Sequence, residues 1–391
     1  DIPFTEAWQG TENLSPKVDD AAAVYAAINT LYDEGIADLG KTSIGAPAVD
    51  IFYGGDVAKW ITLANTLKFR LALNTGDQAG ITAALAAGVI DEDAEDWVFT
   101  YGSNRQNPDS RHPWYGGAYE SFSGPYQSNY FMWELMEEKP FADPRLRYYY
   151  KRQDLQIVGE DLFTIDCVVP DTRPVWYDNQ YTNAYGETKT WPFCAGSSLT
   201  TVDASYAKGY WGRDHGNDEG IPPDGFERTL AGIYPAGGAY DDLSFGGLGA
   251  GDGAAGQGVT PIVANSWMHF MNAEVAVMTG GDPTTETLAG IRSHMNKVDD
   301  VPGAPAMDQA AIDAYIANFA IEWTAASTLD AKLELWAEEF WITQRGNGID
   351  AYNSYRRNGY PKNLQPMVEP DPGPFPAVSY THLTLPTNRE V

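Results

Sequence analysis

Apolar side chains recur at helical spacing in the first part of the chain. In residues 18–40 they return every three or four positions, and Gly40 closes the stretch. A second stretch of this kind covers about 57–75 with Gly76 after it, and a shorter one covers 78–87. Such spacing, ended by glycine, predicts amphipathic α-helices. The chain therefore opens with three predicted helices.

The pattern changes between residues 97 and 260. Gly, Pro, Asn and Asp recur there every few positions, and helical periodicity remains only around 128–138. These residue types favour turns and short strands over long helices. The stretch is too long for a structureless loop in a compact domain, so we expect an irregular subdomain with its own packed aromatic side chains. Functional residues concentrate in such loop-rich segments.

Helical periodicity returns in four later stretches, at 261–280, 284–297, 308–325 and 328–345. The order of helices, insertion and helices predicts a mainly α fold. We expect a tetratricopeptide-like scaffold of helical hairpins without a constant repeat length, carrying a large loop-rich insertion with short strands. The predicted parts are an N-terminal scaffold over 1–96, a ligand-binding or capping insertion over 97–260, a C-terminal scaffold over 261–363 and an extended or disordered tail over 364–391.

Charge and aromatic content narrow the classes of ligand. The chain has 25 basic and 54 acidic residues, and a formal net charge of −29 repels phosphate backbones, so we expect no nucleic-acid partner. It also has 12 Trp and 23 Tyr. Because an aromatic face offers apolar contact to the C–H side of a ring, this composition suits neutral ring-shaped ligands such as sugars. No apolar run is long enough to predict a membrane span.

Motifs for catalysis, cofactors or metals are absent or incomplete. The stretch 251–256 satisfies G-x-G-x-x-G, but no strand enters it and no helix leaves it, so we predict a flexible loop and not a nucleotide site. The histidines lack close metal-ligand spacing, and no Ser or Cys lies in a G-x-S-x-G elbow. Cys167 and Cys194 allow one optional disulfide. We expect no catalytic residue, metal or cofactor.

The segment "GYWGRDHGNDEGIPPDG", residues 209–225, combines aromatic, basic and acidic side chains with Gly and Pro. It fails as an EF-hand because Gly216 stands where an oxygen ligand is required. A non-standard calcium site near Asp214 and Asp218 stays open. The prediction is a rigid turn that presents Tyr210 and Trp211, because proline and glycine fix its backbone.

Aromatic side chains in or beside the Gly/Pro-rich loops of the insertion are the candidate ligand-binding residues. Each alone is more often a packing residue, but their number in one insertion favours a binding platform. The candidates are Trp114, Tyr115, Tyr126, Tyr130, Trp176, Trp191 and Trp211.

Six stretches in order resemble the SusD/RagB family of outer-membrane lipoproteins, in its SusD-like branch. The resemblance covers most of residues 1–365. The stretches are "IPFTEAWQG", "DIFYGGDVAKWITLANTLKFRLAL", "DPRL", "GYWGRDHGNDEGIPPDG", "RTLAGIYPAGGAYDD" and "WITQRGNGIDAYNSYRRNGYP".

The resemblance implies a tetratricopeptide-like scaffold with an irregular ligand-binding portion, held on the outer face of the outer membrane by a lipidated N-terminal cysteine. It implies a cell-surface nutrient-binding protein, not an enzyme, that takes a glycan or other oligomer and acts as the lid of a SusC-like TonB-dependent transporter. The anchor and the residues before the first motif are missing here, and "SYTHLTLPTNREV" is unlike the family's usual ending. Ligand-contacting aromatics vary across the family, so the resemblance assigns no site residue.

Two other functions stay open from the sequence. One is a glycoside hydrolase of helical architecture with paired carboxylates, whose separation the sequence does not give. The other is a helical scaffold that binds only protein. Release of reducing ends from polysaccharides would favour the hydrolase, and failure to bind any glycan would favour the scaffold.

Overall fold

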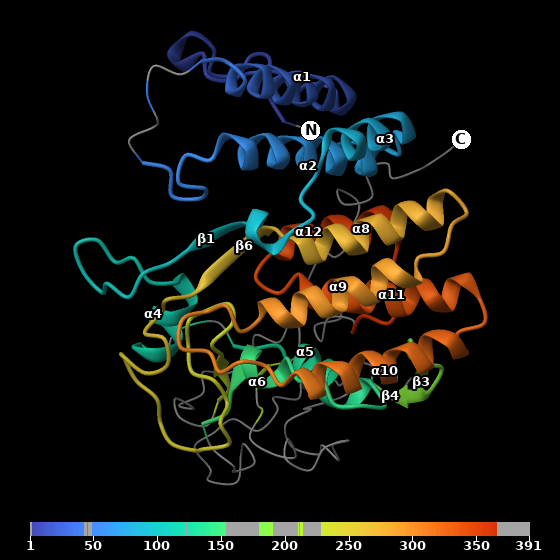
Figure 1. The fold of residues 1–391 in the computed structure, drawn as a ribbon. Helices are drawn as coiled ribbons and strands as arrows, with labels where there is room; N and C mark the ends of the chain where they lie inside the picture. The colour runs from blue at the N-terminus through green and yellow to red at the C-terminus, as the bar shows by residue number, and fades with distance from the viewer. Residues whose placement is uncertain are drawn as a thin grey trace. The chain divides into compact units, whose positions relative to one another are not determined.

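A computed structural model of the chain describes residues 2–42, 45, 49–121, 124, 126–153, 180–190, 210, 212–213 and 228–365. The chain divides into two compact units, residues 1–97 with 263–268 and residues 98–262 with 269–391. Helices dominate the described residues, so the prediction of a mainly α protein is confirmed (Figure 1). The four-part organisation given above stays a prediction.

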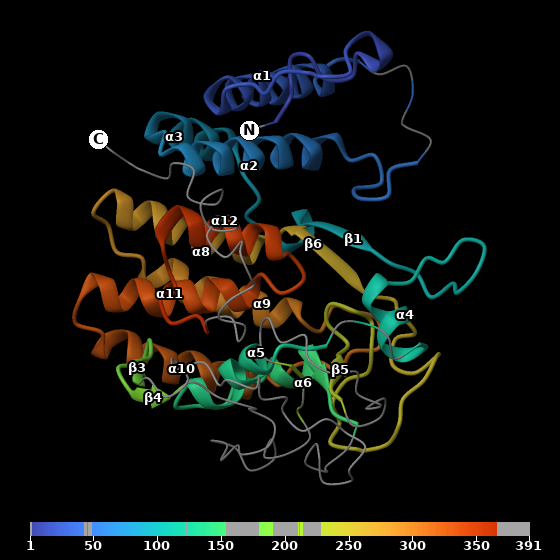
Figure 2. The ribbon, with the colours of Figure 1, turned by 180° about the vertical axis from the view of Figure 1, so that it is seen from behind.

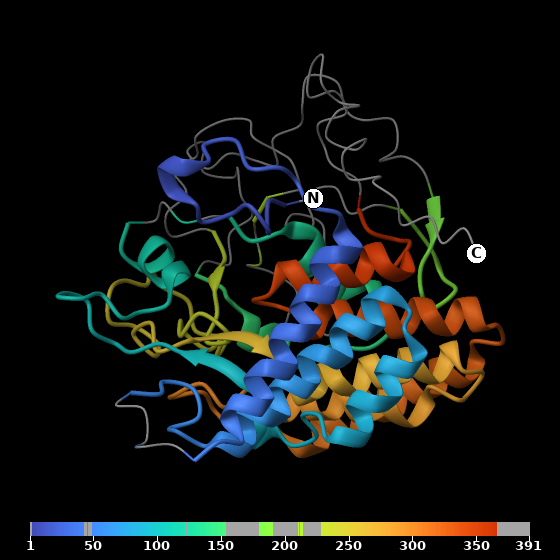
Figure 3. The same cartoon turned by 90° about the horizontal axis from the view of Figure 1, so that it is seen from above.

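Three helices form most of the first unit, as the sequence predicted. They run side by side, and the second of them, residues 57–75, contacts both the first and the third (Figure 3). Each begins at an aspartate whose carboxylate accepts hydrogen bonds from backbone N–H groups of the first turn. The helices are α1 (Ala21–Leu39), α2 (Val57–Thr75) and α3 (Gln78–Ala87), and two short turns are η1 (Gly10–Glu12) and η2 (Asp93–Glu95).

The core of this unit lies between α2 and α3. Leu63, Phe69 and Leu73 of α2 are buried, and Ile81 of α3 is buried with them. By contrast, α1 buries only Val24. The amphipathic pattern of α2 therefore marks a real core face.

The second unit is built on longer helices near the C-terminus. In the views from front and back, α9, α11 and α10 lie side by side, and α9 contacts both of the others (Figures 1 and 2). These helices are α8 (Asn265–Met278), α9 (Thr284–Lys297), α10 (Gln309–Ala325), α11 (Leu329–Thr343) and α12 (Gly348–Asn358).

Aromatic side chains fill the space between these helices. The rings of Phe270 and Phe340 stack with their centres 5.1 Å apart, and the indole N–H of Trp336 donates to the carbonyl of Phe270. A Cβ at Gly290 would lie 2.7 Å from the Phe270 ring, so glycine lets α9 approach α8 closely.

The insertion holds short strands paired in two-stranded sheets, as predicted, and it also holds short helices outside the one helical stretch expected around 128–138. β2 (Tyr150–Lys151) pairs antiparallel with β5 (Leu230–Ala231), and Tyr150 lies opposite Ala231. The other sheets pair β1 (Trp97–Thr100) with β6 (Val259–Val263) and β3 (Gln180–Thr182) with β4 (Thr188–Thr190). The short helices are α4 (Pro113–Tyr119), α5 (Asn129–Trp133), the π-helical turn η3 (Glu134–Glu138) and α6 (Leu146–Tyr149).

A buried ionic network joins the "DPRL" stretch to the C-terminal helices. Lys139 donates to Asp143 at 2.8 Å and to Glu339 at 2.9 Å, and Arg145 donates to Glu339 at 2.8 Å. All four side chains are fully buried, and the hydroxyl of Tyr315 takes part. Buried charges persist only when they are paired and hydrogen-bonded, so the network fixes how the insertion joins α10 and α11.

Candidate ligand-binding site

Three of the seven candidate aromatics, Trp176, Trp191 and Trp211, lie outside the described residues. The same holds for Cys167 and Cys194, and for Asp214 and Asp218 of the possible calcium site. These expectations stay predictions. In the part of the chain that is described, no cluster of three His, Cys, Asp or Glu side chains could hold a metal ion.

Tyr115 is a core residue. It lies on helix α4, although the Gly/Pro-rich composition around it predicts a loop. Pro113 is the first residue of this helix, and the His112 side chain caps its N-terminus. The Tyr115 ring is fully buried and stacks on Tyr119 at 4.6 Å, with the planes 8° apart. Both faces of such a ring lie in protein, which leaves no room for a sugar without rearrangement.

The hydroxyl of Tyr115 organises the glycine-rich stretch 251–256. It donates to the carbonyl of Asp252 at 2.8 Å and accepts from the N–H of Gly251 at 3.0 Å. A Cβ at Gly253 would lie 2.1 Å from the carbonyl oxygen of Gly238. The expectation of a flexible loop is therefore wrong, because these glycines permit close backbone packing.

Tyr130 is also buried, at 5% exposure, and its hydroxyl donates to the carbonyl of Asn363 at 2.7 Å. Its ring lies 5.9 Å from that of Trp133 and 6.0 Å from that of Trp341. The structure thus uses Tyr130 to hold the chain after α12 against α5.

Trp114 keeps part of its ring exposed while its neighbours fix its orientation. The ring of His112 meets it edge-on at 5.4 Å, and the guanidinium of Arg345 lies 6.0 Å from its centre. Burial lowers the pKa of His112 to about 4, so that imidazole is neutral at neutral pH. Trp114 is thus a partly exposed aromatic ring held between a neutral ring and a cation.

Tyr126, also partly exposed, lies against two arginines. The guanidinium groups of Arg213 and Arg228 lie 4.5 and 5.1 Å from its ring centre. The N–H of Arg213 donates to the carbonyl of Gln127 at 2.9 Å, and a Cβ at Gly212 would lie 1.9 Å from that oxygen. Glycine at 212 therefore lets this segment pack directly on the strand-like stretch before α5.

The prediction that the turn at residues 209–225 presents Tyr210 at the surface is wrong, because Tyr210 is buried. It is 1% exposed, its hydroxyl bonds to the carboxylate of Asp241, and the guanidinium of Arg152 lies 4.8 Å from its ring. The aromatic side chain at this position anchors the segment and does not face a ligand.

Arg345 is the residue that sequence reasoning missed. Its guanidinium donates to the Tyr150 hydroxyl at 2.8 Å, to Gln127 Oε1 at 3.1 Å and to the Tyr149 carbonyl at 3.0 Å. Its Nε is buried and donates to no described atom. It belongs to the stretch "WITQRGNGIDAYNSYRRNGYP", but no spacing in that stretch points to Trp114, which is far away in sequence.

Three carboxyl groups gather in the core of the second unit, but they do not line a cleft. Glu134, Glu138 and Glu338 are at most 1% exposed. Burial raises the pKa of Glu138 to about 8 and that of Glu338 to about 7, and burial with the charges of Glu338 and Glu138 raises the pKa of Glu134 well above its usual range. A glycosidic bond cannot reach these groups, so they do not form the carboxylate pair of a hydrolase.

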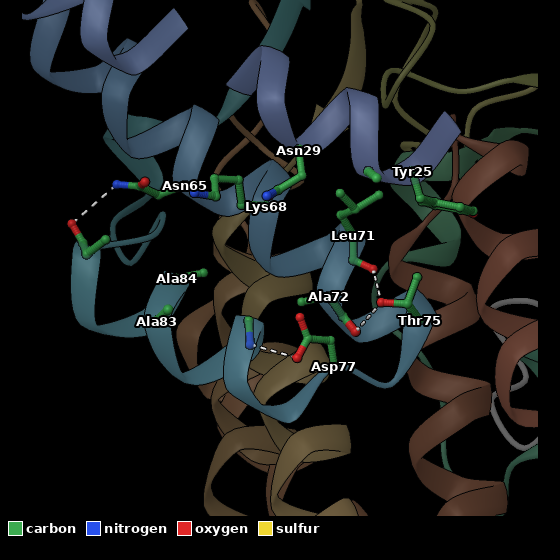
Figure 4. A pocket seen from close by; sticks show the side chains of 13 residues that line it. Tyr25, Asn29, Asn65, Lys68, Leu71, Ala72, Thr75, Asp77, Ala83 and Ala84 are labelled. Carbon is green, nitrogen blue, oxygen red and sulfur yellow. Dashed lines mark hydrogen bonds between the residues drawn. The ribbon is translucent and has the colours of Figure 1, made fainter. Parts of the chain in front are cut away.

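The first unit contains a cavity of about 400 Å³ between α1, α2 and α3 (Figure 4). Three of its polar side chains have partners: Asn65 donates to the Ala87 carbonyl, Lys68 pairs with Asp33, and Asp77 caps α3. Tyr25 is the one aromatic residue in its lining. A cavity with a single aromatic residue in its lining gives little for a sugar ring to stack on.

Within the described residues, every helix is too short or too polar to cross a lipid bilayer. No curated protein matches the chain. Residues 1–161 match the family SusD-like_2, which is described as "Starch-binding associating with outer membrane".

The fold matches solved structures over most of the chain. A SusD homologue from Bacteroides ovatus superposes with a TM-score of 0.60 at 19% identity, over 94% of this chain and 66% of that one. A chitin-binding SusD homologue from Flavobacterium johnsoniae gives 0.57 at 19% identity, over 94% and 65%. A protein described as chitin-binding gives 0.58 at 21% identity, over 95% and 66%.

The chain spans about two thirds of the length of these solved structures. Identities at this level establish a shared fold and nothing about ligands. Residues 1–161 thus match the SusD-like family in sequence, and the chain shares the fold of SusD homologues over most of its length.

Proposed function

We propose that this protein is a cell-surface nutrient-binding protein that captures a glycan or other oligomer by aromatic stacking and hydrogen bonds. The observation that carries the proposal is Trp114, a partly exposed ring held in place by Arg345 and His112. A preorganised ring loses little freedom when a ligand binds, so more of the contact energy remains as affinity. The family description as starch-binding and the chitin-binding relatives support a carbohydrate ligand.

The binding energy expected from one such ring is modest. Stacking that covers an area on the order of 100 Å² contributes about 2 kcal/mol at ~25 cal/mol per Å². Gln127 supplies a side-chain amide that can form hydrogen bonds with the hydroxyls of a sugar stacked on Trp114. Its Oε1 also accepts a hydrogen bond from Arg345. Modest affinity suits a protein that must release its cargo. Tyr126 and the predicted Trp176, Trp191 and Trp211 would extend the platform.

The proposed partner is a SusC-like TonB-dependent transporter in the outer membrane, for which this protein forms the lid. The family's association with the outer membrane supports that location. We propose attachment to the membrane through a lipid anchor, and binding without chemical change to the ligand. The buried state of Glu134, Glu138 and Glu338 supports a role without hydrolysis.

The test is affinity electrophoresis through gels that contain starch, glycol chitin or other polysaccharides. We expect at least one polysaccharide to retard the protein, and Trp114→Ala to weaken that retention about thirty-fold, as a loss of about 2 kcal/mol implies. Trp8→Ala is the matched control, because Trp8 is fully exposed in the first unit. Equal loss in both variants, or release of reducing ends by the wild-type protein, would contradict the proposal.

A further inference from the structure

A second pocket lies in the second unit, between α11, α12 and the chain that follows α12. Its volume is about 250 Å³. Four aromatic side chains line it, with neutral or apolar residues between them: Trp341 from α11, Tyr352 and Tyr355 from α12, and Tyr360. Tyr352 and Tyr355 are each 41% exposed, so their rings are accessible from the surface.

The Gln344 amide is the unusual group in this lining. Gln344 is 4% exposed, and its buried Oε1 accepts no hydrogen bond from any described residue. A buried amide oxygen without a donor costs free energy on the order of 1–3 kcal/mol. Such a cost is offset when a ligand supplies the missing donor.

The pocket offers further polar groups for a ligand. The indole N–H of Trp341 and the hydroxyls of Tyr352 and Tyr355 belong to side chains of this lining. Sugar recognition combines aromatic faces for the C–H side of a ring with side-chain donors and acceptors for its hydroxyls, and this lining has both.

The absence of charged side chains from the lining narrows the class of ligand. The chain carries a formal charge of −29, yet no Asp, Glu, Lys or Arg lines this pocket. Arg356 and Lys362 lie 5.7 and 4.5 Å from the ring centres of Tyr352 and Tyr360, but neither side chain lines the pocket. The lining itself therefore offers a charged ligand no opposite charge in place of its lost hydration. The lining therefore fits a neutral ring.

We propose that the pocket between α11 and α12 binds one neutral sugar ring, as a second glycan subsite separate from Trp114. Gln344 bonds hydroxyls of the ring, and Tyr352 and Tyr355 contact its apolar face. The inference rests on the proposed function for the ligand class, but it concerns a different surface. The two can therefore fail independently.

The experiment is ¹⁹F NMR of the protein labelled with 5-fluorotryptophan, which reports on each tryptophan separately. The signals of Trp114 and Trp341 are assigned with Trp114→Phe and Trp341→Phe. Chitin and starch oligosaccharides are the probes. We expect the Trp341 signal to shift on titration, and Gln344→Ala or Tyr352→Ala to weaken that response about five- to ten-fold while the Trp114 response is retained.

The matched control is Asn353→Ala, because Asn353 is exposed on α12 and does not line the pocket. A Trp114 shift without a Trp341 shift would overturn this inference and leave the proposed function in place. No shift at either signal would overturn both. Two further results would overturn the subsite. One is a Trp341 response that is unchanged in Tyr352→Ala. The other is a Trp341 response that occurs only after removal of residues 366–391.

Discussion

Gln344 and Arg345 are neighbours in sequence just after α11, yet they serve different places. The amide of Gln344 lines the pocket between α11 and α12, whereas the guanidinium of Arg345 lies 6.0 Å from the ring centre of Trp114. The side chains of consecutive residues at the end of a helix project in different directions. Two neighbouring residues can therefore support both proposed binding surfaces. Substitutions at these two positions should have separable effects.

Arg345→Lys should weaken glycan binding at Trp114 and lower the free energy of unfolding by about 1–3 kcal/mol. Lysine cannot reproduce the three hydrogen bonds of the guanidinium or its contact with the Tyr150 ring at 4.2 Å. Urea denaturation and affinity electrophoresis measure the two effects. Arg105→Lys is the control, since Arg105 is largely exposed in its pair with Glu120; an equal loss in both variants would count against the positioning role of Arg345.

Gly253→Ala should destabilise the protein by more than about 2 kcal/mol. The backbone φ is +64° there, and the new Cβ would lie 2.1 Å from the carbonyl oxygen of Gly238. Gly249→Ala is the matched control, because a Cβ at Gly249 meets nothing within 4 Å. Thermal unfolding of both variants tests whether 251–256 is a packed segment; equal midpoints would show that it is not.

Stability should fall as pH rises from about 6.5 to about 8 and level off above that. Glu338 and Glu138 titrate in the folded protein at pKa values of about 7 and about 8, raised by burial from the usual 4.5. The folded state therefore holds more protons than the unfolded state, and the stability that those protons provide is lost as pH rises through the folded pKa values. His112 and His294, whose pKa values burial lowers, act in the opposite direction only below about 6.5.

Unfolding midpoints measured across this pH range check the prediction. Glu138→Gln should flatten the fall, because the amide does not ionise. Glu92→Gln, at an exposed position, should leave it unchanged. A midpoint that stays constant or rises in wild-type protein would contradict the assignment of protonated carboxyl groups in the core.

Lys139→Met should cost about 3–5 kcal/mol, because it leaves Asp143 and Glu339 buried with one cation fewer. Lys41→Met removes a surface pair with Asp38 and should change stability by less than about 1 kcal/mol. Chemical denaturation of the two variants and the wild-type protein measures these changes in the free energy of unfolding. A small effect at Lys139 would mean that Arg145 alone balances the two carboxylates.

Local sequence patterns were enough to predict the helical scaffold, because helix signals act over a few residues. The predicted stretches 57–75 and 78–87 match α2 and α3, and 308–325 and 328–345 match α10 and α11 within two residues. The spacing of apolar residues and the glycine that follows them determine helix formation within one or two helical turns of the chain. The resemblance to the SusD/RagB family also rests on short stretches of sequence, and residues 1–161 match the SusD-like family model.

Which aromatic residues are accessible depends on packing between distant parts of the chain. Tyr115 and Tyr130 share the loop-rich composition of Trp114, but stacking on Tyr119 and a bond to Asn363 bury them. The stretch 261–280 shows the same limit: its start belongs to strand β6, because β6 pairs with β1, which lies far away in sequence. Burial, strand pairing and the placement of Arg345 beside Trp114 depend on contacts between residues distant along the chain, and local pattern carries no information about those contacts.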